Sequence, residues 1–383
     1  TMHSKILAWT QKHRQHLDKL DSKYIIQHMT NNKKHPFGQF YVLYKIHKGQ
    51  NNNRWPTRPV CSDVSSITHG LGKWVDQMLQ PIAAAQHSYL KDSFALKEMI
   101  CKLHLPPNAL LFTCDAKSIY TNIPTETVLT IISQYITTEE KKSFHHYSSQ
   151  ALIEALQIVF RNNVIQFGDT FWRQTSGTGM GISPAPPWAT IFYALHENTI
   201  LPQYSQNLIF YKRFIDNVLG IWLPHPCQHQ NKILFKYHMQ EYHGLEWDFT
   251  PLSTSCNFMD LTISVTNNHL TTTLFEKQQN LYLYIPPHSS HPTGMIQGLI
   301  HGNILRIHRL CTYKHDIQRK TQTFFQRLIH RGYSPTHLCP IFKQAEYKAA
   351  SFLTRIQTQN TTSQPSNNTT HHPKIFLHLQ YHP

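Results

Sequence analysis

The sequence predicts an α+β fold, in which an antiparallel sheet is backed by helices. Two apolar, β-rich runs, Leu208–Phe214 and Val218–Trp222, flank the polar break Asp216-Asn217, a pattern typical of a β-hairpin with an acidic tip. Ala109–Asp115 is a short, continuously apolar run that ends in an acid, which predicts a buried strand. Segments with helical spacing of apolar residues lie on both sides of these strands and complete the mixed class.

Length and charge limit the possible functions. At 383 residues the chain is longer than most single cores, so two or three packed units are expected. Lys and Arg number 36 against 21 Asp and Glu, which gives a net charge of +15, and aromatic residues make up 12%. This balance favours an anionic partner, most simply nucleic acid, although a merely basic soluble protein would show the same charge.

Cysteine usage and hydropathy indicate the compartment. Seven cysteines are scattered without a CxxC pair, which argues against a disulfide framework and against a thiolate zinc site. This pattern fits a reducing, intracellular compartment, so we expect a nuclear or cytoplasmic protein. No run reaches the roughly 18 apolar residues of a membrane span, and no signal peptide opens the sequence, so no membrane partner is expected.

The N-terminal part of the chain predicts helices around one strand pair. Residues 5–28 carry apolar positions at loosely helical spacing, which favours one surface helix. Phe40–Ile46 has a strand pattern, and Arg54–Cys61 is expected to be extended because its two prolines forbid a helix. Helical spacing returns over Gly70–Leu90.

The middle of the chain alternates helices and hairpins. Pro124 is expected to start a helix through about Ile136, since proline is favoured in the first turn, and Ser149–Phe160 predicts another. Val164–Thr175 alternates around a Gly-Asp turn, which indicates a hairpin. A glycine-rich loop, SGTGMG, then leads into the apolar segment Trp188–Ile200, which is expected to be helical.

The remaining chain is expected to hold a helix with three strands, then a basic helical region, and then a polar tail. One helix and three strands are predicted, at Lys232–Tyr242, Leu245–Thr250, Phe258–Val265 and Leu270–Phe275. A basic helical region is expected from residue 277 to about Gln357. Residues 358–383 hold too little apolar content to fold alone, so we expect disorder there.

Two acids separated by 101 residues, Asp115 and Asp216, raise the question of a metal site. Carboxylates projected from adjacent strands of one sheet are what a two-metal phosphoryl-transfer site requires. In such a site one Mg²⁺ lowers the pKa of the attacking hydroxyl, and the other holds the triphosphate and stabilises the departing pyrophosphate. Two distant aspartates considered alone are more often structural.

The residues around these acids favour the metal site. Asp115 is followed by AKSIYTNIP, Asp216 is preceded by YKRFI and followed by Asn, and GTGMGISPAPPWATIF lies between them. In that order the three segments resemble motifs A, C and B of reverse transcriptases. With FYVLYKIHK and PTRPV upstream, and FMDL and SSHP downstream, they resemble specifically the Penelope-like retroelement branch, over roughly residues 38–310.

The resemblance implies a right-hand polymerase with fingers, palm and thumb, and an antiparallel palm sheet backed by helices. It further implies an RNA-directed DNA polymerase that uses Mg²⁺, or Mn²⁺, together with an RNA template, a DNA primer and dNTPs. The expected organisation is an N-terminal extension with fingers at 1–106, a palm with an inserted fingers segment at 107–275, a thumb-like basic region at 276–357 and a disordered tail at 358–383.

The resemblance also implies roles for individual residues. Asp115 and Asp216 would bind Mg²⁺, with Asn217 as a third catalytic position. Tyr120 lies where reverse transcriptases place an aromatic steric gate that selects deoxynucleotides, although it could be an ordinary core tyrosine. Lys45 and Arg58 would contact the incoming triphosphate, although either could be a solvated surface charge.

Further contacts are implied for the glycine loop and the basic region. Glycines remove Cβ and let the backbone approach a nucleotide closely, although this loop could be only a hairpin-to-helix turn. The nucleotide-binding candidates are Gln174, Gly179, Met180 and Gly181. The candidates for holding the duplex through its phosphates are Arg306, Arg309 and Lys314.

Two positions depart from the family pattern. Reverse transcriptases usually have a second aspartate directly after the first in motif C, and this chain has Asn217. Losing one negative charge weakens the compensation of two Mg²⁺ ions, although an amide oxygen can still coordinate. Motif B has Thr190 after Ala189, where the family usually has Asn. The alternative hypothesis is therefore a decayed, catalytically impaired copy of the element that retains only nucleic-acid binding.

Overall fold

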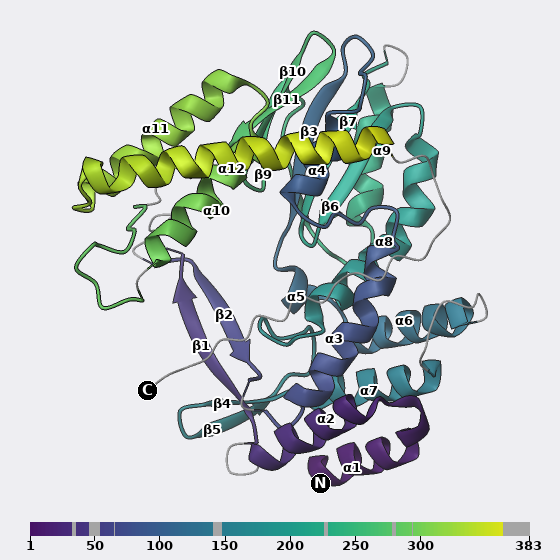
Figure 1. Cartoon of the computed structure of the whole chain (residues 1–383). Coiled ribbons are helices and arrows are strands. Elements are labelled where there is room, and N and C mark those ends of the chain that lie inside the picture. The colour runs from purple at the N-terminus through teal and green to yellow at the C-terminus, as the bar shows by residue number, and fades with distance from the viewer. Residues whose placement is uncertain are drawn as a thin grey trace. The chain divides into compact units, whose positions relative to one another are not determined.

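The computed structural model describes residues 1–32, 36–45, 54–64, 66–140, 148–225, 229–277, 281–292 and 294–362. The chain divides into two compact units, Thr1–Leu281 and Tyr282–Pro383, which we describe separately (Figure 1). None of the described helices has the length and apolar character needed to cross a membrane.

The N-terminal unit mixes helices with short strands. Its helices are α1 (Met2–Lys12), α2 (Lys19–Asn31), α3 (His69–Ala84), α4 (Ser93–Ile100), α5 (Ile119–Asn122), α6 (Thr125–Glu140), α7 (Ser149–Arg161), α8 (Ala185–Ile200) and α9 (His229–Gln240), with short 3₁₀ turns at Arg14–His16 and Leu201–Tyr204. Its strands are β1 (Gly38–Tyr44), β2 (Thr57–Ser62), β3 (Leu110–Ala116), β4 (Val164–Phe167), β5 (Thr170–Arg173), β6 (Leu208–Phe214), β7 (Asn217–Trp222), β8 (Trp247–Phe249), β9 (Ser255–Phe258), β10 (Leu261–Thr266) and β11 (His269–Leu274).

The sheet that carries both predicted metal ligands is four-stranded and antiparallel, with the order β6-β7-β3-β8. The hairpin and the buried strand predicted from the sequence are therefore neighbours. β3 pairs directly with β7, and Phe112 lies opposite Gly220. A Cβ on Gly220 would stand 2.2 Å from Cζ of Phe112, so glycine is what allows the ring to lie across β7.

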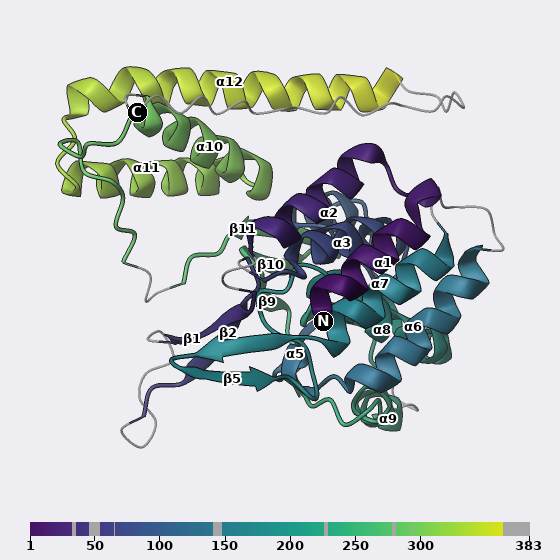
Figure 2. The ribbon, with the colours of Figure 1, turned by 90° about the horizontal axis from the view of Figure 1, so that it is seen from below.

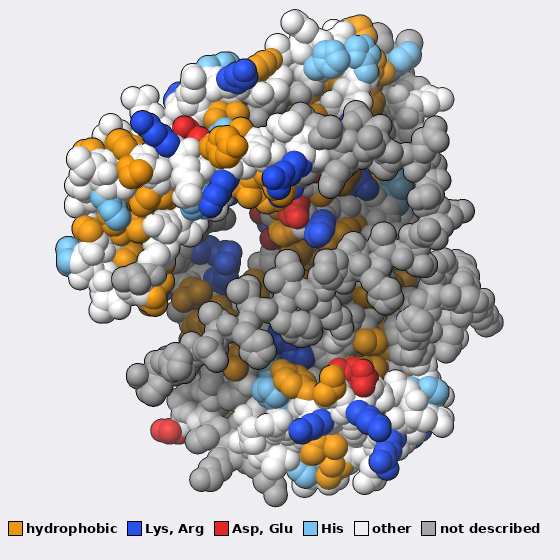
Figure 3. All heavy atoms as spheres, viewed as in Figure 1, with side chains coloured by type: hydrophobic (Ala, Val, Ile, Leu, Met, Phe, Trp, Pro, Cys, Tyr) orange, Lys and Arg blue, Asp and Glu red, His pale blue; other side chains and the backbone are white. Residues whose placement is uncertain are grey.

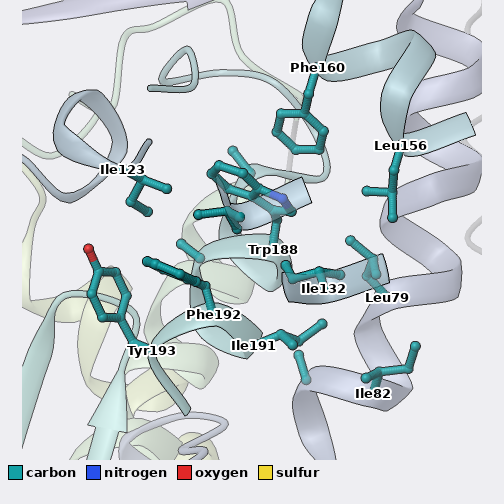
Figure 4. Close-up of a cluster of buried hydrophobic side chains, with 14 of the residues drawn as sticks. Leu79, Ile82, Ile123, Ile132, Leu156, Phe160, Trp188, Ile191, Phe192 and Tyr193 are labelled. Carbon is teal, nitrogen blue, oxygen red and sulfur yellow. The ribbon is translucent and has the colours of Figure 1, made fainter. Parts of the chain in front are cut away.

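Helix α8 is the centre of the core behind this sheet. Proline in its first turn suits a helix start, and 11 of its 16 residues are buried, as expected for a helix that is apolar on most sides. Figure 4 shows Trp188 and Phe192 of α8 among side chains from α3, α6 and α7. The rings of Trp188 and Phe160 stack with centroids 4.5 Å apart. The core therefore fixes α8 relative to the sheet.

A second sheet has the order β2-β1-β4-β5. It joins two hairpins that are distant in sequence, because β1 pairs in parallel with β4 through Gly38 and Ile165 (Figure 2). Aromatic side chains remain exposed on it, among them Tyr44 at 66% and Trp172 at 61%. A third sheet, β11-β10-β9, follows the palm strands in sequence.

The described residues of the C-terminal unit form three helices, α10 (Met295–Leu310), α11 (Lys314–His330) and α12 (Pro335–Thr362). A preceding segment is anchored to them, because Arg331 donates from Nε to the carbonyl of Tyr284 and Tyr333 donates from its hydroxyl to the carbonyl of Ile285. Residues 282–362 hold ten Lys and Arg against two acids. Figure 3 shows basic side chains outnumbering acidic ones on the displayed face of these helices.

Three predictions about elements were wrong. The single helix expected over 5–28 is two helices, because the chain turns at Arg14–His16 and Asp18 caps α2. The single strand expected over Phe258–Val265 is interrupted by a turn at Met259, which has a φ of +53°. Helix α12 continues to Thr362, five residues into the segment expected to be disordered, and the rest of that segment lies outside the described residues.

Candidate active site

Asp115 and Asp216 lie next to each other at one end of the β3–β7 pair. Asp115 is the register partner of Asn217, and the backbone N–H of Ala116 donates to the carbonyl of Asp216 over 2.8 Å. The Asn217 side chain shares the face of Asp115, because directly paired residues project together. Asn217 Nδ2 in turn donates to Oδ1 of Asp216 over 2.8 Å. Asn217 therefore shares a sheet face with one aspartate and is hydrogen-bonded to the other.

The composition of the hairpin tip differs from the sequence prediction. The expected turn residues were Asp216 and Asn217, but Phe214 pairs with Asn217, so the turn consists of Ile215 and Asp216. Asn217 is the first residue of β7 and faces Asp115. Ile215 has a φ of +56°, a conformation that a β-branched residue rarely adopts. The position after Asp216 is therefore part of the sheet surface rather than of the turn.

The oxygen ligands at this site suit a hard divalent cation. Two carboxylates and an amide supply only oxygen donors, which Mg²⁺ prefers. Asp115 is exposed and Asp216 is half-buried, so a cation can reach both. Among the described residues, no group of three or more His, Cys, Asp and Glu side chains is arranged to hold a metal ion. The residues fit Mg²⁺ with one negative charge fewer than an all-aspartate set.

A buried ion pair lies directly behind the turn. Glu197 of α8 and Arg213 of β6 are each 1% exposed, and Arg213 Nε donates to Glu197 Oε1 over 2.6 Å. The hydroxyl of Tyr211 donates to the same carboxylate. Burial would lower the pKa of Arg213, but the Glu197 carboxylate outweighs it and raises that pKa above its ordinary value. No pattern in the sequence indicated that these two residues would meet.

Tyr120 lies beside Asp216, as the steric-gate prediction requires. Burial, and then the negative charge of Asp216, raise the pKa of Tyr120 to about 12, so its phenol is neutral at physiological pH. The carbonyl of Tyr120 accepts from the backbone N–H of Thr178 over 2.6 Å. The structure therefore brings Tyr120, Asp216 and the glycine loop together, while the role of Tyr120 stays a prediction.

The glycine loop lies between the segment after β3 and strand β2. A Cβ on Gly177 would meet the carbonyl of Thr121 at 2.6 Å, and a Cβ on Gly179 would meet Cβ of Cys61 at 2.7 Å. Gly181 has a φ of +120°, and the Cys61 N–H donates to the carbonyl of Met180 over 2.8 Å. Glycine is needed here for close backbone approach.

The other nucleotide-binding candidates are on the second sheet and its exit. Arg58 pairs with Leu43 in the β1–β2 hairpin, and the backbone N–H of Lys45 donates to the carbonyl of Pro56 at the same end. Gln174 uses its side chain internally, since it accepts from Asn163 over 2.6 Å and donates to the carbonyl of Ser176 over 3.0 Å. Gln174 therefore shapes the loop from within the protein.

Sequence reasoning missed a third acid beside the pair. Asp248 of β8 is the other register partner of Asp115, and Lys117 contacts its carboxylate at 3.1 Å. The ammonium offsets the repulsion expected between carboxylates paired across strands. A lone acid in a three-residue strand carries no sequence signal that would reveal this neighbour.

A cleft of about 650 Å³ opens beside Phe214 and Asn217. Its walls come from the start of α4, from the β9–β10 turn and from the chain after β11. They include Lys91 and Lys277, the acids Asp92 and Asp260, and the aromatic ring of Phe275. Two cations, two acids, an amide and aromatic rings therefore line the space next to the metal candidates.

The predicted duplex-binding residues lie in the C-terminal unit. Arg306 and Arg309 are on α10, and Lys314 begins α11. Arg306 and Lys314 are exposed and Arg309 is half-buried. A family model described as an animal helix-turn-helix domain matches residues 283–340, which hold α10, α11 and the start of α12.

No curated protein matches the sequence, whereas solved polymerases match the fold. BmCPV RNA-dependent RNA polymerase at elongation state has a TM-score of 0.51 and 12% identity, over 85% of this chain and 29% of that chain. Telomerase from Candida albicans, in complex with a TWJ fragment of telomeric RNA, has a TM-score of 0.54 and 10% identity, over 86% of this chain and 61% of that chain. A structure described as an RdRp complex has a TM-score of 0.50 and 12% identity, over 79% of this chain and 28% of that chain.

These similarities cover most of this chain but only part of each longer protein: less than a third of the two viral polymerases and about three fifths of telomerase. At 10–12% identity they show the fold alone. The chain has the α+β, right-hand fold of nucleic-acid polymerases, as the sequence predicted.

Proposed function

We propose that the chain is an RNA-directed DNA polymerase of a Penelope-like retroelement, acting in the nucleus or cytoplasm. It transfers nucleotides from dNTPs to a primer 3′-hydroxyl on an RNA template. One observation carries the proposal: the β3–β7 register puts Asp115 opposite Asn217, whose amide binds the carboxylate of Asp216. The fold shared with telomerase and viral polymerases supports the same reaction class.

Each part of the site has a task in this proposal. Asp115, Asp216 and the Asn217 amide oxygen would hold two Mg²⁺ ions, which activate the primer hydroxyl and neutralise the triphosphate. The neutral Tyr120 phenol would occupy the space of a 2′-hydroxyl. The loop around Gly179 would lie against the nucleotide, and the cleft at Lys91 and Lys277 would hold the primer end. Lys45 and Arg58 would bind the phosphates from the β1–β2 hairpin.

Primer extension on an RNA template tests the proposal, with dNTPs and either Mg²⁺ or Mn²⁺. The unaltered chain should extend the primer and Asp216→Ala should not. Asp169→Asn is a matched control, because it removes an exposed carboxylate from the β4–β5 turn and should extend normally. Extension by Asp216→Ala would refute the role given to Asp216, and no extension by the unaltered chain with either metal would refute the polymerase.

A second candidate function is nucleic-acid binding without turnover. Two observations favour it: the neutral Asn217 beside Asp216, and the eight net positive charges of residues 282–362. Duplex affinity measured against salt tests the binding, because phosphate contacts give a steep fall of log affinity with log salt. Charge reversal at Arg306, Arg309 and Lys314 should flatten the slope by about one unit per contact. A flat plot for the unaltered chain would contradict this function.

A further inference from the structure

The turn that presents Asp216 adopts an unfavourable backbone conformation. Ile215 is the first of its two central residues and has a φ of +56°. Hairpin turns with positive φ at this position normally use glycine, because a side chain there strains the backbone. Such a conformation persists only where the surrounding structure holds it in place.

Side-chain packing around the turn is incomplete. A partly open pocket of about 160 Å³ lies beside it, lined by Ile215 and Phe214 on one side and by Thr190 and Pro187 of α8 on the other. The side chains that face this pocket have fewer contact partners there, so hydrogen bonds to the turn add to the constraint on its conformation.

Arg213 supplies those hydrogen bonds. Its Nη1 donates to the carbonyl of Ile215 over 2.9 Å, which ties the turn to the guanidinium. Its Nε and Nη2 donate to the two carboxylate oxygens of Glu197 over 2.6 and 2.9 Å, and Nη2 also donates to the carbonyl of Thr190. Because a guanidinium is planar and rigid, fixing these atoms also fixes the direction of Nη1.

The backbone of Arg213 is held as firmly as its side chain. Its N–H donates to the carbonyl of Ser88 over 2.7 Å, and its carbonyl accepts from the N–H of Leu90 over 3.0 Å. Ser88 is fully buried and Leu90 is 1% exposed. Arg213 therefore links α8, the 88–90 segment and the turn at one point.

We propose that the buried Glu197–Arg213 pair is a positioning device for Asp216, which holds the Ile215–Asp216 turn in the conformation that lets Asp216 share a metal ion with Asp115. The inference rests on the proposed function, since it assumes that this pair of carboxylates binds a divalent cation. Glu197 and Arg213 are both buried, and the pair would act on Asp216 through the carbonyl of Ile215.

Mn²⁺ binding tests the inference without requiring polymerase activity. Mn²⁺ alone is titrated into the full chain and followed by electron paramagnetic resonance, and Asp115→Asn identifies the share of binding that belongs to this site. Arg213→Lys keeps the charge but loses the fork of donors. It should weaken that share about 10- to 100-fold, as is typical when a group that orients a metal ligand is altered.

A control separates positioning from stability. Tyr211→Phe removes a buried hydrogen bond to Glu197 but leaves the Arg213 contact with Ile215 intact. It should lower the melting temperature and leave Mn²⁺ affinity unchanged. Equal weakening by Tyr211→Phe would show that general destabilisation, not positioning, sets the affinity.

A second substitution keeps the inference testable if Arg213→Lys folds poorly. Ile215→Gly removes the strain at φ +56°, so the turn no longer needs the clamp, and Ile215→Gly/Glu197→Gln should bind Mn²⁺ more tightly than Glu197→Gln alone. Failure of this rescue, or an unaltered Mn²⁺ affinity in a folded Arg213→Lys, would overturn the inference and leave the proposed function standing. Absence of Asp115-dependent Mn²⁺ binding in the unaltered chain would overturn the proposed function and the inference with it.

Discussion

Asn217 donates a hydrogen bond from its side-chain Nδ2 to Oδ1 of Asp216, with 2.8 Å between the two atoms. The donor lies on a strand and the acceptor in the adjoining turn, so the carboxylate is held without a metal ion. An aspartate at position 217 would offer no such donor and would add a negative charge. The same position therefore balances the stability of the metal-free protein against its affinity for cations.

Asn217→Asp should lower the stability of the metal-free protein and raise its affinity for cations. We expect Mn²⁺ affinity to rise by at least about tenfold, because ligand charge sets the affinity of oxygen sites, and primer extension to rise with it. The metal-free variant should melt at a lower temperature, since two carboxylates then repel each other. Asn217→Ala is the control and should bind Mn²⁺ no better than the unaltered chain; equal affinity of Asn217→Asp and the unaltered chain would contradict the prediction.

Tyr120→Ala should relax selection against ribonucleotides. The ring lies beside Asp216, and removing it opens space for a 2′-hydroxyl, so the preference for deoxynucleotides should fall about 10- to 100-fold. Single-nucleotide incorporation with matched dNTP and rNTP gives the ratio. Tyr120→Phe keeps the ring and should keep the preference. An unchanged ratio in Tyr120→Ala would remove this residue from the gating role.

Two Arg–Glu pairs allow a matched stability test. Glu197→Ala leaves the buried Arg213 without its counter-ion and should lower the free energy of unfolding by about 3–5 kcal/mol. Glu126→Ala breaks the exposed pair with Arg161, which should cost at most about 1 kcal/mol because solvent screens both charges. Urea unfolding measures both, and similar losses would show that burial is not what makes the first pair important.

Gly220→Ala should destabilise the palm sheet. The added Cβ would stand 2.2 Å from Cζ of Phe112, which is itself 2% exposed, so one of them must shift, at a cost of about 1–3 kcal/mol. Gly302→Ala is the control: a Cβ there meets nothing within 4 Å, and alanine favours a helix by up to about 1 kcal/mol. Opposite changes in melting temperature are expected, and a neutral Gly220→Ala would contradict the contact.

The packing of α1 on α7 should lose stability at acid pH, because Glu154 becomes protonated there. Burial alone would raise the pKa of Glu154, but hydrogen bonds from His13, Lys12 and Gln150 outweigh it and lower that pKa to about 2. A lowered carboxyl pKa adds stability that is complete above the ordinary value of 4.5 and is lost as the pH falls towards 2. Urea unfolding at several pH values should show this loss, and Glu154→Gln should show less of it. The same slope in both proteins would refute the assignment.

Local patterns were enough to predict most elements, whereas the pairing of the two aspartates was expected from the resemblance to reverse transcriptases. Apolar runs ended by polar residues placed β3 and the β6–β7 hairpin within two residues of their bounds, because a buried strand must exclude polar side chains along its length. The prediction of one strand over Phe258–Val265 failed because Met259 adopts a positive φ, and a methionine in a sequence does not indicate such a conformation. The break before α2 could have been found from Asp18, a suitable N-cap.

Tertiary partners could not be predicted in the same way. Glu197 follows apolar residues on α8 and would be expected to face solvent, yet it is buried because Arg213 arrives from β6. Asp248 lies beside Asp115 only because β8 adds to the edge of the sheet. Both relationships depend on strand order and helix packing, which a single sequence does not encode in any local spacing.

The parallel pairing of Gly38 with Ile165 has a consequence for synthesis of the chain. The two positions are 127 residues apart, so β1 must wait for its neighbour on the order of 10 s at ordinary translation speeds. Until β4 leaves the ribosome, the β1 edge at Gly38 and Gln39 lacks this partner strand and is open to pairing with other chains. We therefore expect yield in a cell-free system to improve when a chaperone that holds extended segments is present during this interval.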